Sequence, residues 1–535
     1  MLATLFSATL HGLDGRLIRV EVDVAPGLPG FTIVGLPDAA LQEARERVRG
    51  AVRNSGYTWP PRRITVNLAP ADLRKAGAAL DLAMAAGILI GSEQVEASGR
   101  WALLGELSLG GEVRTVPGLL PMVAAIARRG IRRLVVPADG LAEACLVPGV
   151  EPLPAATLGA ALDRLRSAPR RHRRHAPPRV ELAGEPGEAA RAGEGDAGRV
   201  VDPAPETDGL GAPIEVPDLA EVRGQAEARR ALEIALAGGH CLLFVGPPGA
   251  GKTLLARTVP GLLPPLDDAE ATQATIIASV AGLEPVRGLV RRRPFRHPHH
   301  TISYAGMVGG GARLSPGEVT LANDGVLFLD ELPEFDRATL EALRGPLEDG
   351  RVAIARVGRA IVFPARFQLL AAMNPCPCGG AGTDAAACRC QAGVAERYAA
   401  RISGPLRDRI DLWVTMPRIA AAEHVRGPDP EGSAAVAARI EVARRRQLDR
   451  AGRLNARLSG RALRTACGLG GRAESRVIEL AELEGLSARG TERLLRVART
   501  IADLGECATV GEPHLVEAAR FRSPGAARRP LGLAV

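Results

Sequence analysis

One eight-residue segment, residues 246–253, restricts what this chain can fold into more than any other feature. It reads Gly-Pro-Pro-Gly-Ala-Gly-Lys-Thr, and an apolar run of strand length precedes it at residues 241–245. A strand, a glycine-rich turn and a helix in this order let backbone N–H groups and a helix N-terminus surround phosphate oxygens. The pattern predicts a phosphate-binding loop within an α/β sheet, formed by Gly246, Pro247, Pro248, Gly249, Ala250, Gly251, Lys252 and Thr253.

The lysine in this loop is unusual for this chain. Lysine occurs only twice in the 535-residue sequence, as Lys75 and Lys252, and arginine supplies the rest of the 68 basic residues. A narrow ammonium can reach between the β- and γ-phosphates of a nucleotide, whereas a planar guanidinium is too broad for that place. We interpret Lys252 as a position that arginine could not take over, which strengthens the prediction of a nucleotide site.

Polar residues end two further apolar strands of the predicted sheet. Asp330 and Glu331 follow one apolar run, and Asn374 follows another. The Thr253 hydroxyl and Asp330 are expected to hold Mg²⁺. Glu331 is expected to be the general base for the attacking water, and Asn374 to position that water. Acids that only cap a helix are the alternative, which the spacing of about eighty residues from the loop disfavours. ATP and Mg²⁺ are therefore the expected cofactors.

Several other segments are more specific than the nucleotide motifs. They are residues 27–38, 62–73, 293–296 with His299 and His300, 374–379 and 402–405. Together these segments resemble the magnesium-chelatase-like AAA+ ATPases of the YifB/ComM type, over nearly the whole chain except its middle. The resemblance implies that Arg409 is an arginine finger acting in trans and that Arg489 is the sensor 2 arginine. The family usually has an apolar residue at position 407, so Arg401, Arg407 and Arg409 all stay candidates for the finger.

The length exceeds that of a single-core protein, and the resemblance divides the α/β chain into parts. Residues 1–167 are expected to form a Lon-protease-like α/β domain, in which Ala79 and Leu120 replace the catalytic serine and lysine. That domain would be an oligomerisation or DNA-contacting scaffold. The remaining parts are a flexible linker at 168–213, an AAA+ P-loop αβα sandwich at 214–418 with a cysteine-rich insertion at 376–390, a helical lid at 419–525 and a tail at 526–535.

Four of the eight cysteines lie within fifteen residues, in two Cys-x-Cys pairs. A reducing cytoplasm argues against disulfides, and four thiolates can close a tetrahedral Zn²⁺ site. The alternative is a set of free thiols in a loop rich in glycine and alanine. The predicted zinc ligands are Cys376, Cys378, Cys388 and Cys390.

Two arginine-rich stretches are candidates for contact with DNA phosphates. The net charge of +8 permits such contacts without requiring them. The second stretch predicts a β-hairpin that turns near Gly358, and the resemblance places such insertions along the pore of a ring. Histidines 297, 299 and 300 lie close together, but no carboxylate or cysteine lies near them in the sequence, so DNA contact or packing is favoured over metal binding. The candidate arginines are Arg291, Arg292, Arg293, Arg296, Arg351, Arg356 and Arg359.

These features favour an ATP-driven motor that acts on single-stranded or branched DNA as a homo-hexamer. The resemblance points to branch migration during homologous recombination and natural transformation. A chelatase-like ATPase that remodels a protein partner is the alternative, and the complete catalytic set argues against a non-enzymatic scaffold. No apolar stretch is long enough for a membrane helix, and a cytoplasmic location is expected.

Overall fold

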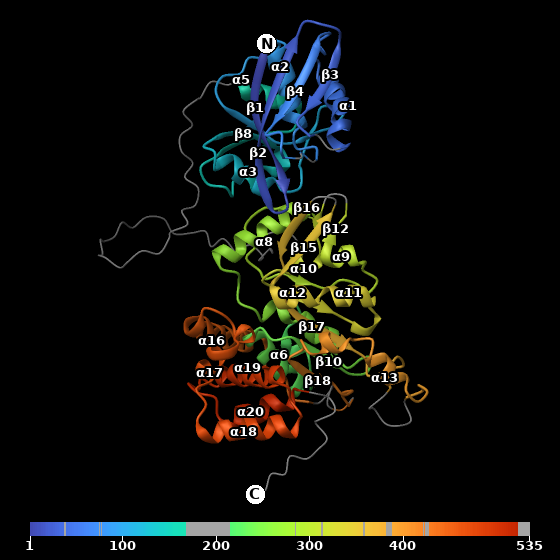
Figure 1. Cartoon of the computed structure of the whole chain (residues 1–535), viewed down its shortest axis with the longest axis vertical. Helices are drawn as coiled ribbons and strands as arrows, with labels where there is room; N and C mark the ends of the chain where they lie inside the picture. The colour runs from blue at the N-terminus through green and yellow to red at the C-terminus, as the bar shows by residue number, and fades with distance from the viewer. Residues whose placement is uncertain are drawn as a thin grey trace, which may run out of the picture. The chain divides into compact units, whose positions relative to one another are not determined.

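The computed structural model describes residues 1–36, 39–73, 75, 77–166, 215–283, 285–311, 314–356, 359–380, 388–420, 422 and 427–522 (Figure 1). The chain forms two compact units, one made mainly of residues 1–213 and the other mainly of residues 214–535. The predicted linker and tail lie outside the described residues, and the predicted domain boundaries stay predictions.

The first unit is built on a mixed sheet in the order β3-β4-β2-β1-β5-β8-β9. Strand β2 runs antiparallel to β4, whereas β3 and β4, β1 and β5, β5 and β8, and β8 and β9 pair in parallel. The seven strands are β1 (Leu2–His11), β2 (Asp14–Ala25), β3 (Gly30–Val34), β4 (Arg63–Ala69), β5 (Trp101–Leu103), β8 (Arg133–Pro137) and β9 (Glu151–Ala155). A small antiparallel pair, β6 (Glu106–Leu107) and β7 (Val113–Arg114), lies apart from this sheet.

Helix α2 (Asp81–Gly91) is the centre of the first unit, and nearly all of its residues are buried. A helix that is apolar on every side is stable only when it is covered on every side. Its one acidic residue, Asp81, is buried and accepts a 2.8 Å hydrogen bond from Arg47 Nε. Ala79 and Leu120 are also buried, and neither carries a nucleophile or a base. The other helices are α1 (Ala39–Asn54), α3 (Leu119–Ala127), α4 (Leu141–Ala144) and α5 (Leu158–Arg166).

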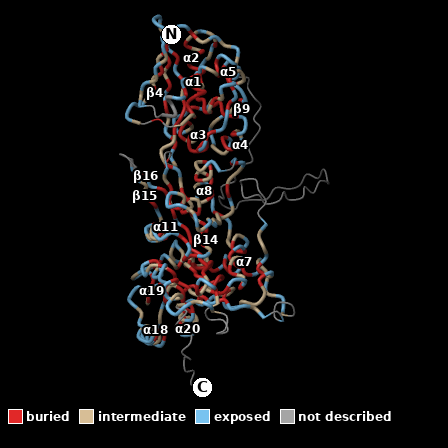
Figure 2. Tube along the Cα trace, turned by 90° about the vertical axis from the view of Figure 1, so that its right-hand side faces the viewer, coloured by how far each residue is buried: buried red, intermediate tan, exposed pale blue. Residues whose placement is uncertain are grey.

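The second unit contains a five-stranded parallel sheet in the order β11-β14-β17-β10-β18. The strands are β10 (Leu242–Val245), β11 (Phe295–Arg296), β14 (Val326–Leu329), β17 (Gln368–Met373) and β18 (Leu412–Thr415). Strands buried on both faces are mostly apolar, and every residue of β14 and β17 is buried. Figure 2 shows buried, red trace around β14. This strand order and the parallel pairing are typical of an AAA+ core, as the sequence predicts.

Alternate residues of the central strands enter two separate apolar cores. Val326 and Phe328 pack on one face with α6 (Ala226–Gly238), whereas Leu327 and Leu329 pack on the other. The sheet is therefore the middle layer of a sandwich. The helices of this core include α7 (Lys252–Arg257), α8 (Asp268–Ala281), α9 (Tyr304–Val308), α10 (Glu318–Leu321), α11 (Arg337–Ala342), α12 (Arg344–Asp349), α13 (Val394–Ala399) and α14 (Gly404–Arg407).

The expected hairpin is confirmed, because β15 (Arg351–Arg356) pairs antiparallel with β16 (Arg359–Pro364). A smaller hairpin joins β12 (Gly309–Gly310) to β13 (Ser315–Pro316). The expected helical C-terminal segment is confirmed too. It consists of α16 (Ser433–Ala451), α17 (Gly460–Cys467), α18 (Gly471–Leu483), α19 (Ala488–Leu504) and α20 (Glu512–Arg520), and its apolar residues share a core with α6 and one face of the sheet.

Candidate nucleotide site and neighbouring clusters

The predicted phosphate-binding loop joins the end of β10 to the start of α7. Gly249 and Gly251 have φ angles of 80° and 87°, a left-handed conformation that residues with a Cβ rarely adopt. A Cβ on either glycine would meet no atom within 4 Å, so the backbone conformation, and not crowding, requires glycine there. Such a turn directs successive N–H groups towards one point, where an anion can bind.

Lys252 is buried at the start of α7, and its ammonium is held over the loop. Nζ donates hydrogen bonds to Gly246 O at 2.5 Å and Pro247 O at 3.0 Å, and to Asn374 Oδ1 at 3.1 Å. Burial lowers the pKa of Lys252, while the charges of Asp330 and Glu331 act in the opposite direction. A nucleotide phosphate would offer the desolvated ammonium a stronger partner than a carbonyl oxygen.

The two predicted magnesium ligands lie side by side. Thr253 Oγ1 donates a 2.6 Å hydrogen bond to Asp330 Oδ2, although 77 residues separate them in sequence. Asp330 follows β14 and Asn374 follows β17, and these two neighbouring parallel strands place both side chains at the same edge of the sheet. Hydroxyl and carboxylate oxygens are the ligands that Mg²⁺ prefers, so these residues fit the ion.

Glu331 occupies a strained position next to Asp330. Its φ of 54° lies in the left-handed region, and its N–H donates to Asp330 Oδ1 at 2.9 Å. Strain of this kind persists where the surrounding structure over-determines it, often at active sites. The carboxylate is half-exposed, so a water molecule can reach it, as the predicted role of a general base requires.

The histidine cluster lies beside these acids in space, although no carboxylate lies near it in the sequence. His300 Nδ1 is 3.5 Å from Glu331 Oε2, and the His297 ring contacts Phe328 of β14 at a centroid distance of 4.8 Å. Carboxylates thus lie close to the histidines in space. This proximity is not apparent from the sequence because β11, which precedes the histidines and pairs with β14, has only two residues and no apolar run.

Gln225 is another residue that sequence reasoning missed. Its side-chain amide donates to Ala250 O in the phosphate-binding loop at 3.1 Å and to Pro417 O beyond β18 at 2.6 Å. This amide links the loop to the segment that leads towards the lid. A left-handed φ of 52° at Gln225 is the structural mark of this position, and the sequence carries no clear signal for it.

The predicted finger and the predicted sensor 2 residue both lie near Glu348 on α12. Arg409 donates to Glu348 Oε2 and to Pro405 O, and the charges of Arg409 and Arg489 both lower the pKa of Glu348. Of the other two candidates, Arg401 donates to Glu334 at 3.0 Å and Arg407 lies over the Trp413 ring at 5.5 Å. The choice of finger among these arginines stays a prediction.

The arginines expected to contact DNA differ in how free their side chains are. Arg293 donates to Glu270 at 2.8 Å and is largely buried, and Arg296 donates two hydrogen bonds to Glu318 at 2.7 and 2.9 Å. These ion pairs hold both side chains against neighbouring helices, and the predicted phosphate contacts of the two arginines stay predictions. Arg291 forms an exposed pair with Asp268. Arg292 is half-buried and Arg351 is exposed, whereas the side chains of Arg356 and Arg359 lie outside the described residues.

The four clustered cysteines come together as predicted, with all Sγ atoms within 4.8 Å of one another. Cys376 Sγ lies 3.4 Å from Cys378 Sγ and 3.9 Å from Cys388 Sγ. A tetrahedral ion with Zn–S bonds of about 2.3 Å requires sulfur spacings of about 3.8 Å. The cluster therefore fits Zn²⁺.

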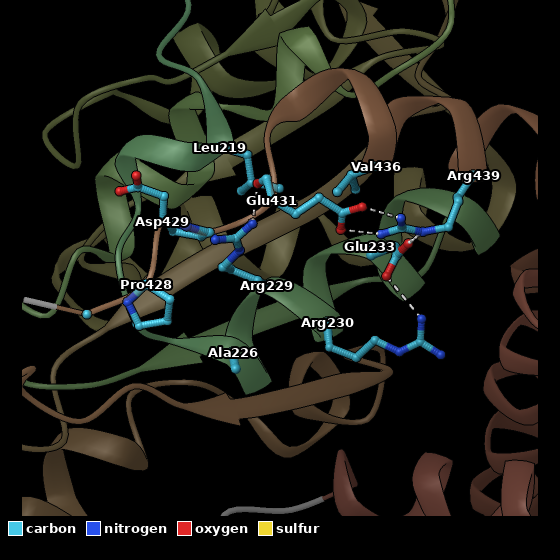
Figure 3. Close-up of a pocket in the computed structure, with 13 residues that line it drawn as sticks. Leu219, Ala226, Arg229, Arg230, Glu233, Pro428, Asp429, Glu431, Val436 and Arg439 are labelled. Carbon is cyan, nitrogen blue, oxygen red and sulfur yellow. Dashed lines mark hydrogen bonds and ion pairs between the residues drawn. The ribbon is translucent and has the colours of Figure 1, made fainter. Parts of the chain in front are cut away.

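A pocket of about 450 Å³ lies between α6, residues 427–431 and α16, and none of its lining residues belongs to the phosphate-binding loop (Figure 3). Arg439 on α16 donates to both Glu431 oxygens at 2.6 and 2.8 Å and to Glu233 on α6 at 2.6 Å. Arg230 also donates to Glu233, at 3.0 Å. We call Arg439, Glu431, Glu233 and Arg230 the lid clasp, because they join the first lid helix to α6.

The parallel sheet, its phosphate-binding loop and the acids at its edge define an AAA+ ATPase core. Three sequence profiles agree: "Magnesium chelatase, subunit ChlI" matches residues 218–424, "Subunit ChlI of Mg-chelatase" matches 20–140, and "Magnesium chelatase, subunit ChlI C-terminal" matches 430–522. The AAA+ domain implies an ATPase that uses ATP and Mg²⁺. No helix within the described ranges is both long and apolar enough to cross a membrane.

Curated relatives match almost the entire chain. The chain is 42% identical to the uncharacterized protein YifB of Escherichia coli over 522 residues, covering 96% of this chain and 95% of YifB. It is 40% identical to competence protein ComM of Haemophilus influenzae over 526 residues, covering 98% and 97% of the two chains. An uncharacterized protein of Mycobacterium tuberculosis is 43% identical over 533 residues, with 98% and 99% covered. The chain belongs to the YifB/ComM family of magnesium-chelatase-like proteins.

Proposed function

We propose that this protein is an ATP-hydrolysing ring motor that acts on DNA, as a branch-migration helicase in homologous recombination and natural transformation. The observation that carries the enzymatic part is the convergence of Lys252, Thr253 and Asp330 at the edge of the parallel sheet. The DNA part is supported by the name of the competence protein, which is 40% identical over nearly the whole chain. The exposed Arg351 on the β15–β16 hairpin also supports it.

The chemistry follows from the positions of the side chains. The loop N–H groups and Lys252 bind the β- and γ-phosphates, and Thr253 and Asp330 hold Mg²⁺, which neutralises developing charge on the phosphates. Glu331 accepts a proton from a water molecule while the water oxygen forms a bond to the γ-phosphorus and the bond to the bridging β–γ oxygen breaks. Asn374, which already contacts Lys252, orients that water.

Hydrolysis in a ring also needs a residue from a neighbouring copy, and we assign this role to Arg409. An arginine finger stabilises charge on the transferring phosphoryl group and contributes a factor of about 10³ to 10⁵ in rate. In this proposal a neighbouring copy's nucleotide replaces Glu348 as the partner of Arg409, and Arg489 contacts the same nucleotide. The assembly we propose is a homo-hexamer. The first unit, with its Lon-protease-like fold, acts as a scaffold because buried Ala79 and Leu120 cannot cut a peptide bond.

A four-way DNA junction labelled on one arm tests the proposal. The wild-type protein with ATP and Mg²⁺ is expected to separate the junction into two duplexes by branch migration. Glu331→Gln is expected to bind the junction without separating it. Arg351→Ala should weaken DNA binding, whereas Arg445→Ala, which removes an exposed arginine of a lid helix, should not. If the protein hydrolyses ATP but does not separate the junction into duplexes, the proposed action on DNA is contradicted and the proposed ATPase activity is not.

A second candidate is an ATPase that remodels a protein partner, as the chelatase description of all three matching profiles suggests. This alternative predicts that ATP turnover is indifferent to every form of DNA and responds to a protein. The two candidates share the nucleotide site and differ only in what the motor moves.

A further inference from the structure

The cysteine cluster lies directly against the phosphate-binding loop. Gly379, one residue after Cys378, is buried, and a Cβ placed on it would lie 2.3 Å from Cδ of Pro248. Gly379 also has a φ of 77°, so both the space and the backbone require glycine there. The proline ring of the loop thus rests on the backbone of the cluster, with no room for any side chain between them.

The same segment touches the loop at a second point. Asn374 accepts a 3.1 Å hydrogen bond from Lys252 Nζ, and the buried Cys376 follows two residues later. The N–H of Gly379 donates to Cys376 O at 2.9 Å and closes a tight turn. Residues 374–379 therefore form a short, compact segment that contacts both the ammonium and the turn of the phosphate-binding loop.

We propose that Zn²⁺ held by Cys376, Cys378, Cys388 and Cys390 braces the phosphate-binding loop, so that metal occupancy sets the affinity for nucleotide. The inference rests on the nucleotide site of the proposed function and adds a regulator to it. Bonds from Cys376 and Cys378 to an ion that Cys388 and Cys390 also hold fix residues 376 to 379 in the conformation that supports Pro248. Without the ion, no bonds hold Cys388 and Cys390 against Cys376 and Cys378, so the support of Pro248 loosens and nucleotide binding itself has to order the loop.

The first measurement is the affinity of the full chain for a fluorescent ATP analogue with excess Mg²⁺ and without DNA. Zinc content is measured on the same samples by elemental analysis. Wild type is expected to carry about one zinc per chain, and Cys378→Ser to lose the zinc and bind the analogue about tenfold more weakly, within the usual range of coupling between two sites. Cys507→Ser, which changes an exposed cysteine of the lid, is the matched control and should alter neither quantity.

A second pair of variants tests the contact between Gly379 and Pro248 without removing the metal. Gly379→Ala should keep its zinc but bind nucleotide more weakly, because the added methyl group displaces Pro248. Gly393→Ala is the control, because its φ of 76° is almost the same and a Cβ there would meet only a distant atom of Arg397 at 3.9 Å. This pair keeps the inference testable even if Cys378→Ser does not fold.

Thermodynamic linkage between zinc binding and nucleotide binding gives a further test that does not depend on ATP hydrolysis. If zinc strengthens nucleotide binding tenfold, nucleotide must strengthen zinc binding by the same factor. Saturating nucleotide should therefore slow the release of zinc to a chromogenic chelator in wild type but not in Lys252→Ala. Purified protein without bound metal, or zinc-free protein that binds nucleotide within twofold of wild type, would overturn the proposal. Turnover that is indifferent to DNA would contradict the DNA function and leave this inference standing.

Discussion

Substitution of Lys252 by arginine tests whether the shape of this side chain, beyond its charge, makes the nucleotide site. The Lys252 ammonium lies 2.5 to 3.1 Å from three oxygen atoms, so it is closely surrounded and already makes three hydrogen bonds. A guanidinium keeps the charge but is too broad to reach between two phosphates. Hydrogen bonds to charged groups contribute about 1.5 to 3 kcal/mol each. Loss of two phosphate contacts therefore costs at least about 3 kcal/mol, or about 150-fold in affinity.

The assay is an equilibrium titration of Lys252→Arg with a fluorescent ATP analogue in the presence of Mg²⁺. Lys75→Arg is the matched control, because Lys75 is the other lysine of the chain and is also buried, with its Nζ donating to Pro70 O in the first unit. Overpacking at Lys75 should lower the free energy of unfolding by about 1 to 3 kcal/mol and leave nucleotide affinity unchanged. Nucleotide affinity of Lys252→Arg within threefold of wild type would refute the argument that only a lysine fits the loop.

Three further predictions follow from the site and the lid. Glu331→Gln should bind ATP normally but hydrolyse it at least about 10²-fold more slowly, because the amide cannot accept the proton from water; unchanged turnover in single-turnover kinetics would remove Glu331 from this role. Arg439→Ala should lower the free energy of unfolding by about 1 to 2 kcal/mol in thermal denaturation, because it leaves the buried Glu233 with one fewer partner. The control Arg445→Ala breaks only an exposed pair with Glu441 and should lower it by less than about 0.5 kcal/mol. Hydrogen bonds from Arg439 lower the pKa of Glu431 below 4.5, so this ion pair stabilises the fold above that pH, and the stabilisation is lost as the pH falls further. In Arg439→Ala the free energy of unfolding should lose this dependence on acid pH. An identical pH profile of the free energy of unfolding in wild type and Arg439→Ala would contradict the lid clasp.

The nucleotide core could be predicted from the sequence because its signals are local. Strands β14 and β17 are buried on both faces, so they are apolar except for Gln368 at the start of β17, and the polar residue that follows each strand falls at the same edge of the sheet. The cysteine cluster could be predicted for the same reason, because its four ligands lie within a short segment.

The features that the sequence did not reveal depend on contacts between distant segments. Strand β11 has two residues and is recognisable only by its pairing with β14, so the contact between His300 and Glu331 could not be foreseen. The carboxylate partners of Arg293 and Arg296 come from helices α8 and α10, which the arginine-rich pattern does not reveal. A cluster of positive charge in a sequence therefore predicts an anion-binding surface poorly when it is unknown which charges are already paired.

The central claim is that ATP hydrolysis at Lys252 and Glu331 drives movement on DNA. Steady-state ATP turnover by the purified full chain, alone and with single-stranded, duplex and four-way-junction DNA, tests it most directly, with Lys252→Ala as the control for contaminating activity. We expect DNA to stimulate turnover several-fold, most strongly with the junction, and we expect Lys252→Ala to lose this stimulation. Equal turnover with and without every form of DNA would contradict the claim and favour the remodelling of a protein partner.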